Sequence, residues 1–474
     1  MSIQNYSLGG GLSKEQLDIL HERALDLCET EGITIPHKGI LDILSQHDGV
    51  KIEKDIAKFS PEVIMEALDA AVYDEPDYAA ERWVLEAGAH QTMVFDIDAC
   101  KFRPANTRDL IDLTKLGDAL DTSGSAPVVP LDVPDHLKHI LMHKVSFEYS
   151  RFRCNDIYEH MDKPTYECAQ YVYDMAQAAG KRFTFGVWMI SPKSFDAKGL
   201  EVAYRLRDKN IPMWISTMPI AGISSPITIL SSVLQSMYEH FCGLAMLHLI
   251  NPNANNYISP DDAFEADAFD MKWCTFVYGS PEYTRHTLHQ IALCNYYGIP
   301  INAKSMLTSA KEPDAHMATE IATHTLIAAL GGARVFRNAG LLSTGEIYSA
   351  EQLVICCEIA EYVQNLIKPE EFSAERLMED EIRAVKPGQL HISRECTVDN
   401  YLSEYWYPEL FTHSNYDQWV SRENGRSIRE AARERAKKLT AQHEYTADED
   451  VIKELNKLYN MAEHDEQLEA SFKS

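Results

Sequence analysis

Apolar residues at helical spacing open the chain. Residues 12–30, LSKEQLDILHERALDLCET, place apolar side chains three and four positions apart, and Ser13 with Gln16 makes a capping box at the start. Residues 59–72, FSPEVIMEALDAAV, repeat the pattern, with Ser60 at the cap and Pro61 in the first helical position. We therefore predict a helical lead-in over residues 1–82 that packs on the rest of the chain.

The sequence pattern changes near residue 83, where short β-rich segments begin to alternate with longer helical segments. The best-defined strands are predicted at 182–190, 211–217, 244–251, 273–279, 299–305 and 333–340. Further strands are expected between residues 85 and 160, where MVFDID and KVSFEYSRFRC are the candidates. Successive β-α units imply parallel strands joined by right-handed crossovers.

Two α/β architectures fit this alternation: an open doubly wound sheet and a closed (β/α)8 barrel. No predicted strand is followed by G-x-G-x-x-G or G-x-x-x-x-G-K-[ST], which weakens a nucleotide-binding open sheet. We therefore predict a (β/α)8 TIM barrel over residues 83–400, with N-terminal and C-terminal helical extensions.

The composition shifts after about residue 400. YLSEYWYPELF is aromatic-rich, and ENGRSIREAARERAKKLTAQ is a charged helix. We assign residues 401–474 to a C-terminal helical extension, with the whole chain as one structural unit. Its last helices, within 425–474, are expected to pack outside the barrel or on a second subunit. The long terminal helices favour a homo-oligomer.

Composition narrows the cellular setting and the class of ligand. The 474 residues carry a formal net charge of −28, which argues against nucleic acid and weakly favours cationic ligands. No apolar run approaches the roughly 20 residues that cross a bilayer, and the N-terminus lacks the features of a signal peptide. The 10 cysteines form no C-x-x-C pair, as expected for reduced thiols. These features predict a cytoplasmic protein with no membrane partner.

Candidate binding residues follow from the rule that barrel enzymes react at the carboxyl ends of their strands. Several aromatic rings facing one cavity would suit a quaternary ammonium ion, which has no N–H to donate and is held by ring quadrupoles. Buried cations at strand ends need partners, either a substrate carboxylate or an internal acid, and both remain open. The strand-end residues include Trp188, Trp214, Tyr278, His248, Lys304 and Arg337.

Two other groups could in principle hold a metal ion. His136, His139 and His143 share one helix face, and Cys356 and Cys357 are adjacent within SAEQLVICCEIAEYV. Both segments have the apolar pattern of ordinary amphipathic helices, so we predict no metal site. No G-x-S-x-G nucleophile motif occurs, and no catalytic residue is assigned.

Long segments of the chain resemble the trimethylamine methyltransferase superfamily, and most closely its members that lack pyrrolysine and use quaternary amines. The resemblance is strongest in MPIAGISSPITILSSVLQSMYEHFCGLAMLHLINPNA and continues through YGSPEYTRHTLHQIALCNYYGIPINAKSMLTSAKEPDAHMATEIATHTLIAALGGARVF. It covers nearly the whole chain. Cys396 departs from the pattern, since many relatives have histidine there.

The resemblance implies a (β/α)8 barrel that passes a methyl group from an amine to the cobalt of a separate corrinoid protein. The chain has no D-x-H-x-x-G motif for ligating cobalamin, so no cofactor is expected to be bound permanently and cob(I)alamin would arrive on a partner. All residues are standard, which excludes the pyrrolysine mechanism and implies a substrate activated by its own positive nitrogen. Glycine betaine is favoured, and proline betaine, carnitine and γ-butyrobetaine remain open.

Roles for the strand-end residues follow from that chemistry. Trp188, Trp214 and Tyr278 are predicted to cage the cation, and Lys304, Arg337 or His248 to hold a substrate carboxylate. Phe95 and Phe152 are secondary candidates for substrate binding. Two alternatives stay open: a zinc-dependent methyltransferase on the same barrel, and a betaine-binding sensor without catalysis.

Overall fold

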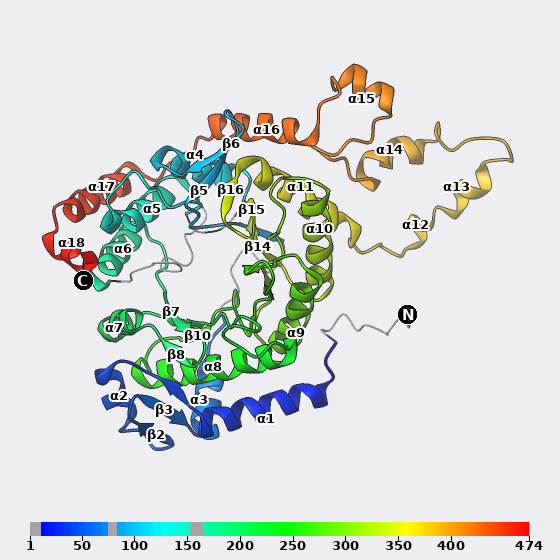
Figure 1. The fold of residues 1–474 in the computed structure, drawn as a ribbon. Helices are drawn as coiled ribbons and strands as arrows, with labels where there is room; N and C mark the ends of the chain where they lie inside the picture. Colours follow the sequence, from blue (N-terminus) through cyan, green and yellow to red (C-terminus); the bar gives the residue numbers. More distant parts are fainter. Residues whose placement is uncertain (1–10, 74–82, 123, 125, 152–164, 474) are drawn as a thin grey trace.

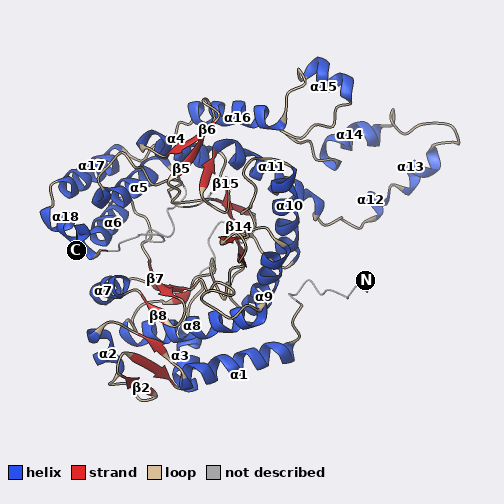
Figure 2. Cartoon of the chain, viewed as in Figure 1, coloured by secondary structure: helices blue, strands red, loops and turns tan. Residues whose placement is uncertain are grey.

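The computed structural model describes residues 11–73, 83–122, 124, 126–151 and 165–473. Its dominant feature is a ring of helices around a set of short strands (Figure 1). Figure 2 shows β7, β14 and β15 inside this ring, whereas β2 lies outside it, beside α2 and α3. The ring consists of α4 (Thr107–Ala119), α5 (Asp135–Tyr149), α6 (Tyr166–Ala178), α7 (Ala197–Leu206), α8 (Ile229–Ile250), α9 (Pro281–Tyr297), α10 (Ala315–Leu330) and α11 (Ala350–Leu366).

The inner strands form two parallel arcs. One arc contains β7 (Phe185–Ile190), β9 (Met213–Ser216) and β10 (Tyr257–Ile258). The other contains β13 (Asn302–Ala303), β14 (Val335–Ala339) and β4 (Val84–Ala87). Because β14, late in the chain, pairs in parallel with the early strand β4, the ring is closed on that side. The structure therefore confirms a mixed α/β fold with barrel-like parallel strands.

Further short strands, most of them paired antiparallel, lie outside the two parallel arcs. β8 (Ser194–Phe195) pairs with the end of β7, and β11 (Phe269–Asp270) with β12 (Thr275–Phe276). A further sheet contains β5 (Met93–Asp96), β6 (Lys101–Pro104), β15 (Leu341–Leu342) and β16 (Ile347–Ser349), in which β5 and β16 pair in parallel and the other pairs are antiparallel. The predicted strand at 273–279 is therefore real only over β12, and it belongs to a hairpin rather than to a parallel arc.

Two predicted strands are wrong. Residues 244–251 continue α8 as helix, and the parallel strand after it is β10. KVSFEYSRFRC begins inside α5, and its last residues lie outside the described part of the chain. The physical reason at α8 is burial on nearly every side, since a helix that is apolar all round carries no helical period to distinguish it from a buried strand.

The N-terminal region covers the outer face of α8. The predicted capping box is confirmed in α1 (Lys14–Thr30), where Ser13 and Gln16 bond reciprocally. α3 (Pro61–Ala70) starts at Pro61 as predicted, although the Ser60 side chain makes no capping bond. The region is not purely helical as expected. Besides α2 (Lys38–Leu44) it contains three strands, β1 (Ile33–Thr34), β2 (Val50–Glu53) and β3 (Ile56–Phe59), and these extend the sheet of β7 through the pairing of β1 with β8.

The C-terminal part consists of helices that pack on the ring and of a segment that projects away from it. α16 (Ile428–Gln442) packs against α11 and α4, and α17 (Glu449–Glu463) against α5 and α6. Between α11 and α16 the chain instead projects away from the ring (Figure 1). This projection carries α12 (Ala374–Leu377), α13 (Glu379–Ala384), α14 (Glu395–Glu404) and α15 (Tyr416–Arg422), and the chain ends after α18 (Glu466–Lys473). Among the described residues, no helix is long and apolar enough to traverse a bilayer.

Candidate functional site

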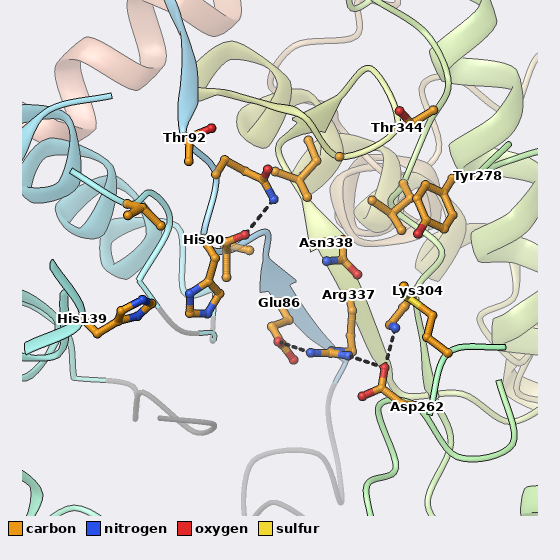
Figure 3. A pocket seen from close by; sticks show the side chains of 18 of the residues that line it. Glu86, His90, Thr92, His139, Asp262, Tyr278, Lys304, Arg337, Asn338 and Thr344 are labelled. Atoms are coloured by element: carbon orange, nitrogen blue, oxygen red, sulfur yellow. Dashed lines mark hydrogen bonds and ion pairs between the residues drawn. The ribbon is translucent and has the colours of Figure 1, made fainter. Parts of the chain in front are cut away.

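A cavity of about 500 Å³ lies at the carboxyl ends of the parallel strands. Figure 3 shows its side chains converging from strands that are far apart in the sequence. Glu86 comes from β4, Trp188 from β7 and Arg337 from β14, while Lys304 directly follows β13. The parallel arcs therefore position the site, as the strand-end rule predicts.

Two of the three predicted cage rings line this cavity. Trp188 and Tyr278 face it directly, whereas Trp214 lies behind Trp188 and is almost completely buried. The two indole rings meet edge-on with centroids 6.0 Å apart. Gly186, paired with Trp214 across β7 and β9, leaves the room that the Trp214 ring fills. Trp214 therefore supports the wall rather than forming its surface.

Tyr278 is held by neighbouring rings. Phe276 stacks on it at 5.4 Å between centroids, and Tyr283 packs edge-on at 5.1 Å. Burial raises the pKa of Tyr278 well above its ordinary value, so the phenol stays neutral. A neutral, electron-rich ring in a fixed orientation is suited to contact a cation through its face.

The predicted cations Lys304 and Arg337 also line the cavity, and both are paired with internal carboxylates. Lys304 contacts Asp262, and its Nζ lies 2.5 Å from a Glu265 oxygen. The Arg337 guanidinium lies 3.2 Å from Glu86 and 3.3 Å from Asp261. A substrate carboxylate that used either cation would therefore compete with acids of the chain itself.

Acidic groups outnumber cations in the cluster around Lys304 and Arg337, and of these acids Glu86 and Asp262 line the cavity. Asp267 is buried, and neither of its carboxyl oxygens has a hydrogen-bond partner among the described residues. Desolvation raises the pKa of Asp267 and of Glu265, whereas Lys304 and Arg337 lower the pKa of Asp262 despite its own burial. Even with Glu265 and Asp267 protonated, the carboxylates of Glu86, Asp261 and Asp262 face only two cations. The wall is consequently suited to a positively charged ligand.

A second wall of the cavity is formed by imidazole and amide groups. His90 and His139 lie close to one another in Figure 3, across the cavity from Lys304 and Tyr278. His90 adopts a left-handed backbone, with φ of 62°, in the segment that follows β4. Gln91 is next to it and donates its side-chain amide to the Ala89 carbonyl at 2.8 Å. This wall offers N–H donors that an anionic group could use.

The other predicted binding residues do not line the cavity. His248 was predicted to lie at the end of a strand. It lies on α8 instead, and it does not line the cavity. Phe95 lies in β5, where it packs on Phe102 at 5.4 Å and beneath the guanidinium of Arg433 at 5.7 Å. Phe152 lies outside the described residues.

The three histidines of α5 have separate surroundings. His139 lines the cavity, His143 is fully buried beside Phe147, and His136 is half-buried elsewhere on the helix. Within the described ranges, no three His, Cys, Asp or Glu side chains are grouped as metal ligands.

The cysteines singled out in the sequence lie away from the cavity. Cys356 is buried in α11, where burial raises the pKa of its thiol to about 12. Cys357, its neighbour on α11, does not line the cavity either. Cys396 lies on α14 with its sulfur 3.4 Å from Glu381.

Sequence reasoning missed the acids and the second wall. The segment DDAFEADAFD, residues 261–270, places several carboxylates in an otherwise apolar run shortly after β10. Buried acids of this kind are uncommon without partners, so the run was a usable signal. Glu86 and His90 carried no such signal, because single polar residues near a strand end are ordinary.

Comparison with known proteins gives the family. The sequence profile described as trimethylamine methyltransferase (MTTB) matches residues 3–465, and the chain belongs to this family. It is 25% identical over 319 residues to trimethylamine methyltransferase MttB of Methanosarcina barkeri (strain Fusaro), covering 65% of this chain and 63% of that protein. The match thus spans less than two thirds of that relative.

Two other relatives are matched over more of their length. Proline betaine:corrinoid methyltransferase of Eubacterium limosum is 23% identical, with 84% of this chain and 86% of that protein covered. L-carnitine:corrinoid methyltransferase of Eubacterium limosum is 22% identical, with 89% and 90% covered. Among solved structures, the Methanosarcina barkeri monomethylamine methyltransferase (MtmB) superposes with a TM-score of 0.47 at 10% identity, covering 97% of this chain and 88% of that chain.

Proposed function

We propose that this protein transfers a methyl group from a quaternary amine, with glycine betaine favoured, to Co(I) of a corrinoid carried by a separate protein. The observation that carries the proposal is a cavity at the strand ends that combines the aromatic faces of Trp188 and Tyr278 with two cations, Lys304 and Arg337, that are already paired with carboxylates of the chain. Membership of the methyltransferase family and the two betaine- and carnitine-named relatives support it.

The same proposal includes the finer architecture. A closed (β/α)8 barrel over residues 83–400 would carry the site, with extensions over 1–82 and 401–474. The parallel pairing of β14 with β4 supports closure. We place the protein in the cytoplasm, as a homo-oligomer that meets the corrinoid protein at the mouth of the barrel.

The charge of the wall fits the chemistry of such a transfer. The methyl group leaves as a methyl-cation equivalent to Co(I), and the nitrogen keeps both electrons of the C–N bond and departs as a neutral tertiary amine. A fully ionised acidic wall would hold the cation and resist this loss of charge. Lys304 and Arg337 neutralise most of the wall, so the cation is attracted without being bound too strongly.

The chain's own contribution would be orientation and exclusion of water. Trp188 and Tyr278 would hold the ammonium group through weak quadrupole contacts, each worth about 0.5–2 kcal/mol, and would point one N–CH3 bond at the mouth. No proton transfer is required at the nitrogen. Lys304 and Arg337 remain candidates for a substrate carboxylate, and the imidazoles of His90 and His139 join them.

The decisive experiment is a substrate panel. The purified protein would be mixed with reduced cobalamin and with glycine betaine, proline betaine, carnitine, γ-butyrobetaine or trimethylamine, and loss of the Co(I) absorbance would be followed. We expect consumption with at least one quaternary amine and none with trimethylamine. Betaine binding without Co(I) consumption would instead favour the sensor, and zinc that co-purifies with activity would favour the zinc-dependent alternative.

Trp188 provides the site-specific test. Substitution Trp188→Ala should lower kcat/KM for the accepted quaternary amine by at least 10-fold, because a cation contact and part of the water-excluding wall are lost. Trp188→Phe should retain more activity. Trp273→Ala removes an indole that is 71% exposed and does not line the cavity, and it should have little effect. Equal rates for Trp188→Ala and wild type would refute the cage.

A further inference from the structure

Phe472 is a cavity-lining residue that comes from outside the ring of helices α4–α11. It lies in the last turn of α18, a helix that packs against α5 and α6 at the outside of the ring (Figure 1). The other residues that line the cavity all fall within residues 86–345. Among the described residues, Phe472 is therefore the contribution of the C-terminal part to the cavity wall.

α18 is fixed at its start. The Asp465 carboxylate accepts hydrogen bonds from the backbone N–H groups of Gln467 and Leu468 at 2.9 and 3.1 Å. It also accepts one from the Tyr171 hydroxyl of α6 at 2.9 Å. Leu468 itself is completely buried. Terminal segments are ordered when they are tied down in this way, so the position of α18 is set by contacts with the ring.

The position of Phe472 follows from this anchor. Leu468 and Phe472 are four residues apart, which places them on the same face of α18. Leu468 belongs to the core that includes the inner residues of α5 and α6, and Phe472 packs against that core while its ring also lines the cavity. Lys473, the next residue, is exposed and pairs with Glu469. The anchored face of the helix therefore directs Phe472 to the cavity.

Phe472 lies on the side of the cavity that α5 forms. α5 contributes Asp135, Lys138 and His139 to the lining, and α18 packs on this helix. Figure 3 shows His139 across the cavity from Tyr278. Phe472 consequently belongs to the wall opposite Tyr278, and we call it the end wall of the cavity.

The two sides differ in what they can bind. Trp188 and Tyr278 offer ring faces beside a cluster of charged groups, which suits an ammonium ion. Phe472 offers an apolar ring that excludes water and makes no hydrogen bond, which suits a methylene chain. The cavity of about 500 Å³ is within the range of roughly 300–1,000 Å³ found for pockets that hold drug-sized ligands. A trimethylammonium group held at Tyr278 therefore leaves room for a substituent directed at Phe472.

We propose that Phe472 is a specificity-determining residue whose ring limits the length of the substituent on the quaternary amine. The inference rests on the proposed function for the class of substrate. With the ammonium group at Trp188 and Tyr278, the substituent extends toward α5 until it meets Phe472. Further methylenes would have to displace a ring that is packed on the core, and such overpacking is unfavourable.

Binding of n-alkyltrimethylammonium ions tests the proposal without methyl transfer. Calorimetric titration of the full-length protein would compare the tetramethyl, butyltrimethyl, hexyltrimethyl and octyltrimethyl ions. The affinity of wild type should rise with chain length and fall once the chain is too long for the end wall. Phe472→Ala should raise the affinity for the octyl ion relative to the butyl ion at least 10-fold, and Phe472→Trp should lower this ratio.

Lys473→Ala is the matched control for these variants. Lys473 follows Phe472 on the same helix, is exposed and does not line the cavity, so the length profile should stay that of wild type. An unchanged profile in Phe472→Ala and Phe472→Trp would overturn the proposal, as would a wild type that binds none of the ions. An equal change in Lys473→Ala would also overturn it, because the effect would then belong to the helix and not to the ring.

The methyl-transfer assay distinguishes this proposal from the proposed function. With reduced cobalamin, the ratio of kcat/KM for γ-butyrobetaine to that for glycine betaine should be at least 10-fold higher in Phe472→Ala than in wild type. If the ions bind with the expected length profile but no amine consumes Co(I), the methyl transfer is refuted and the role of Phe472 stands. If Co(I) is consumed with the same ratio in both proteins, the role of Phe472 is refuted and the methyl transfer stands.

Discussion

Lys304 shows, at the scale of one residue, how positive and negative charges are paired in the cavity wall. Its ammonium group contacts Asp262 and Glu265, which are both buried, while Lys304 itself lines the cavity and is largely buried. Two opposing effects decide its state: burial disfavours the charge, and two adjacent carboxylates favour it. The carboxylates win, so the pKa of Lys304 lies well above its ordinary value and the side chain stays charged.

Removing this cation should therefore destabilise the protein. Lys304→Met leaves two buried acids without their main partner, and we expect a loss of about 3–5 kcal/mol in the free energy of unfolding. Lys304→Met with Glu265→Gln should recover part of the loss, because one acid is neutralised at the same time. Chemical denaturation of the variants measures both effects.

Lys14 provides the control for that measurement. It pairs with Asp18 on the exposed face of α1, so Lys14→Met should change stability little. If Lys304→Met were as stable as wild type, the ion pairs of the wall would not be formed in solution.

Gly186 carries a prediction at the scale of elements, since it sets how β7 and β9 fit together. A Cβ added there would overlap the indole ring of Trp214 on the neighbouring strand. Gly186→Ala should therefore lower the free energy of unfolding by about 1–3 kcal/mol and raise KM for the quaternary amine, because Trp214 supports Trp188.

Gly199→Ala is the matched control for this change. Gly199 lies in α7, and its added Cβ would make only an ordinary contact with Asp196. Alanine is also the better helix former, so this variant should be as stable as wild type or slightly more stable. Thermal unfolding of both variants separates overlap at the strand pair from a general effect of glycine replacement.

The elements also show how far the sequence could lead. Periodicity located β7, β9, β13 and β14 with the helices that follow them, because these short runs alternate with amphipathic helices. It failed at residues 244–251, where α8 is buried on both sides and has no polar face. Trp188, Lys304 and Arg337 were found because the ends of parallel strands meet at one edge. Tyr278 also lines the cavity, although it follows the β11–β12 hairpin and not a parallel strand.

The partners of those residues could not be found in the same way. Glu86 and Asp262 approach Arg337 only after the ring of strands has closed, so their role depends on the three-dimensional arrangement. The same holds for Trp214, whose place behind the cavity wall depends on the absence of a side chain at Gly186.

At the scale of the whole molecule, buried histidines predict a pH dependence of stability. Burial lowers the pKa of His240 and of His324 to about 4, below the value of about 6.5 expected in the unfolded chain. Between these values the unfolded state takes up protons that the folded state does not. The free energy of unfolding therefore falls as pH falls from 6.5 towards 4, by up to ~1.4 kcal/mol per pH unit for each histidine.

Buried acids act in the opposite direction in the same range. Burial raises the pKa of Glu265 and Asp267, so the folded state holds protons that the unfolded state has lost, and acidification favours folding through these groups. A single denaturation curve would report only the sum of both effects. The contribution of one histidine is obtained from the difference between wild type and a variant that lacks it.

His324→Gln is the variant to use, since glutamine can still donate to Thr287, the residue that the His324 ring contacts at 2.9 Å. Denaturation at pH 7.5, 6.5, 5.5 and 5.0 should show the free energy of wild type falling relative to that of the variant only below pH 6.5. The difference should remain constant above that value. A difference that is constant down to pH 5.0 would mean that His324 takes up its proton equally in the folded and unfolded states, contrary to its burial in the structure.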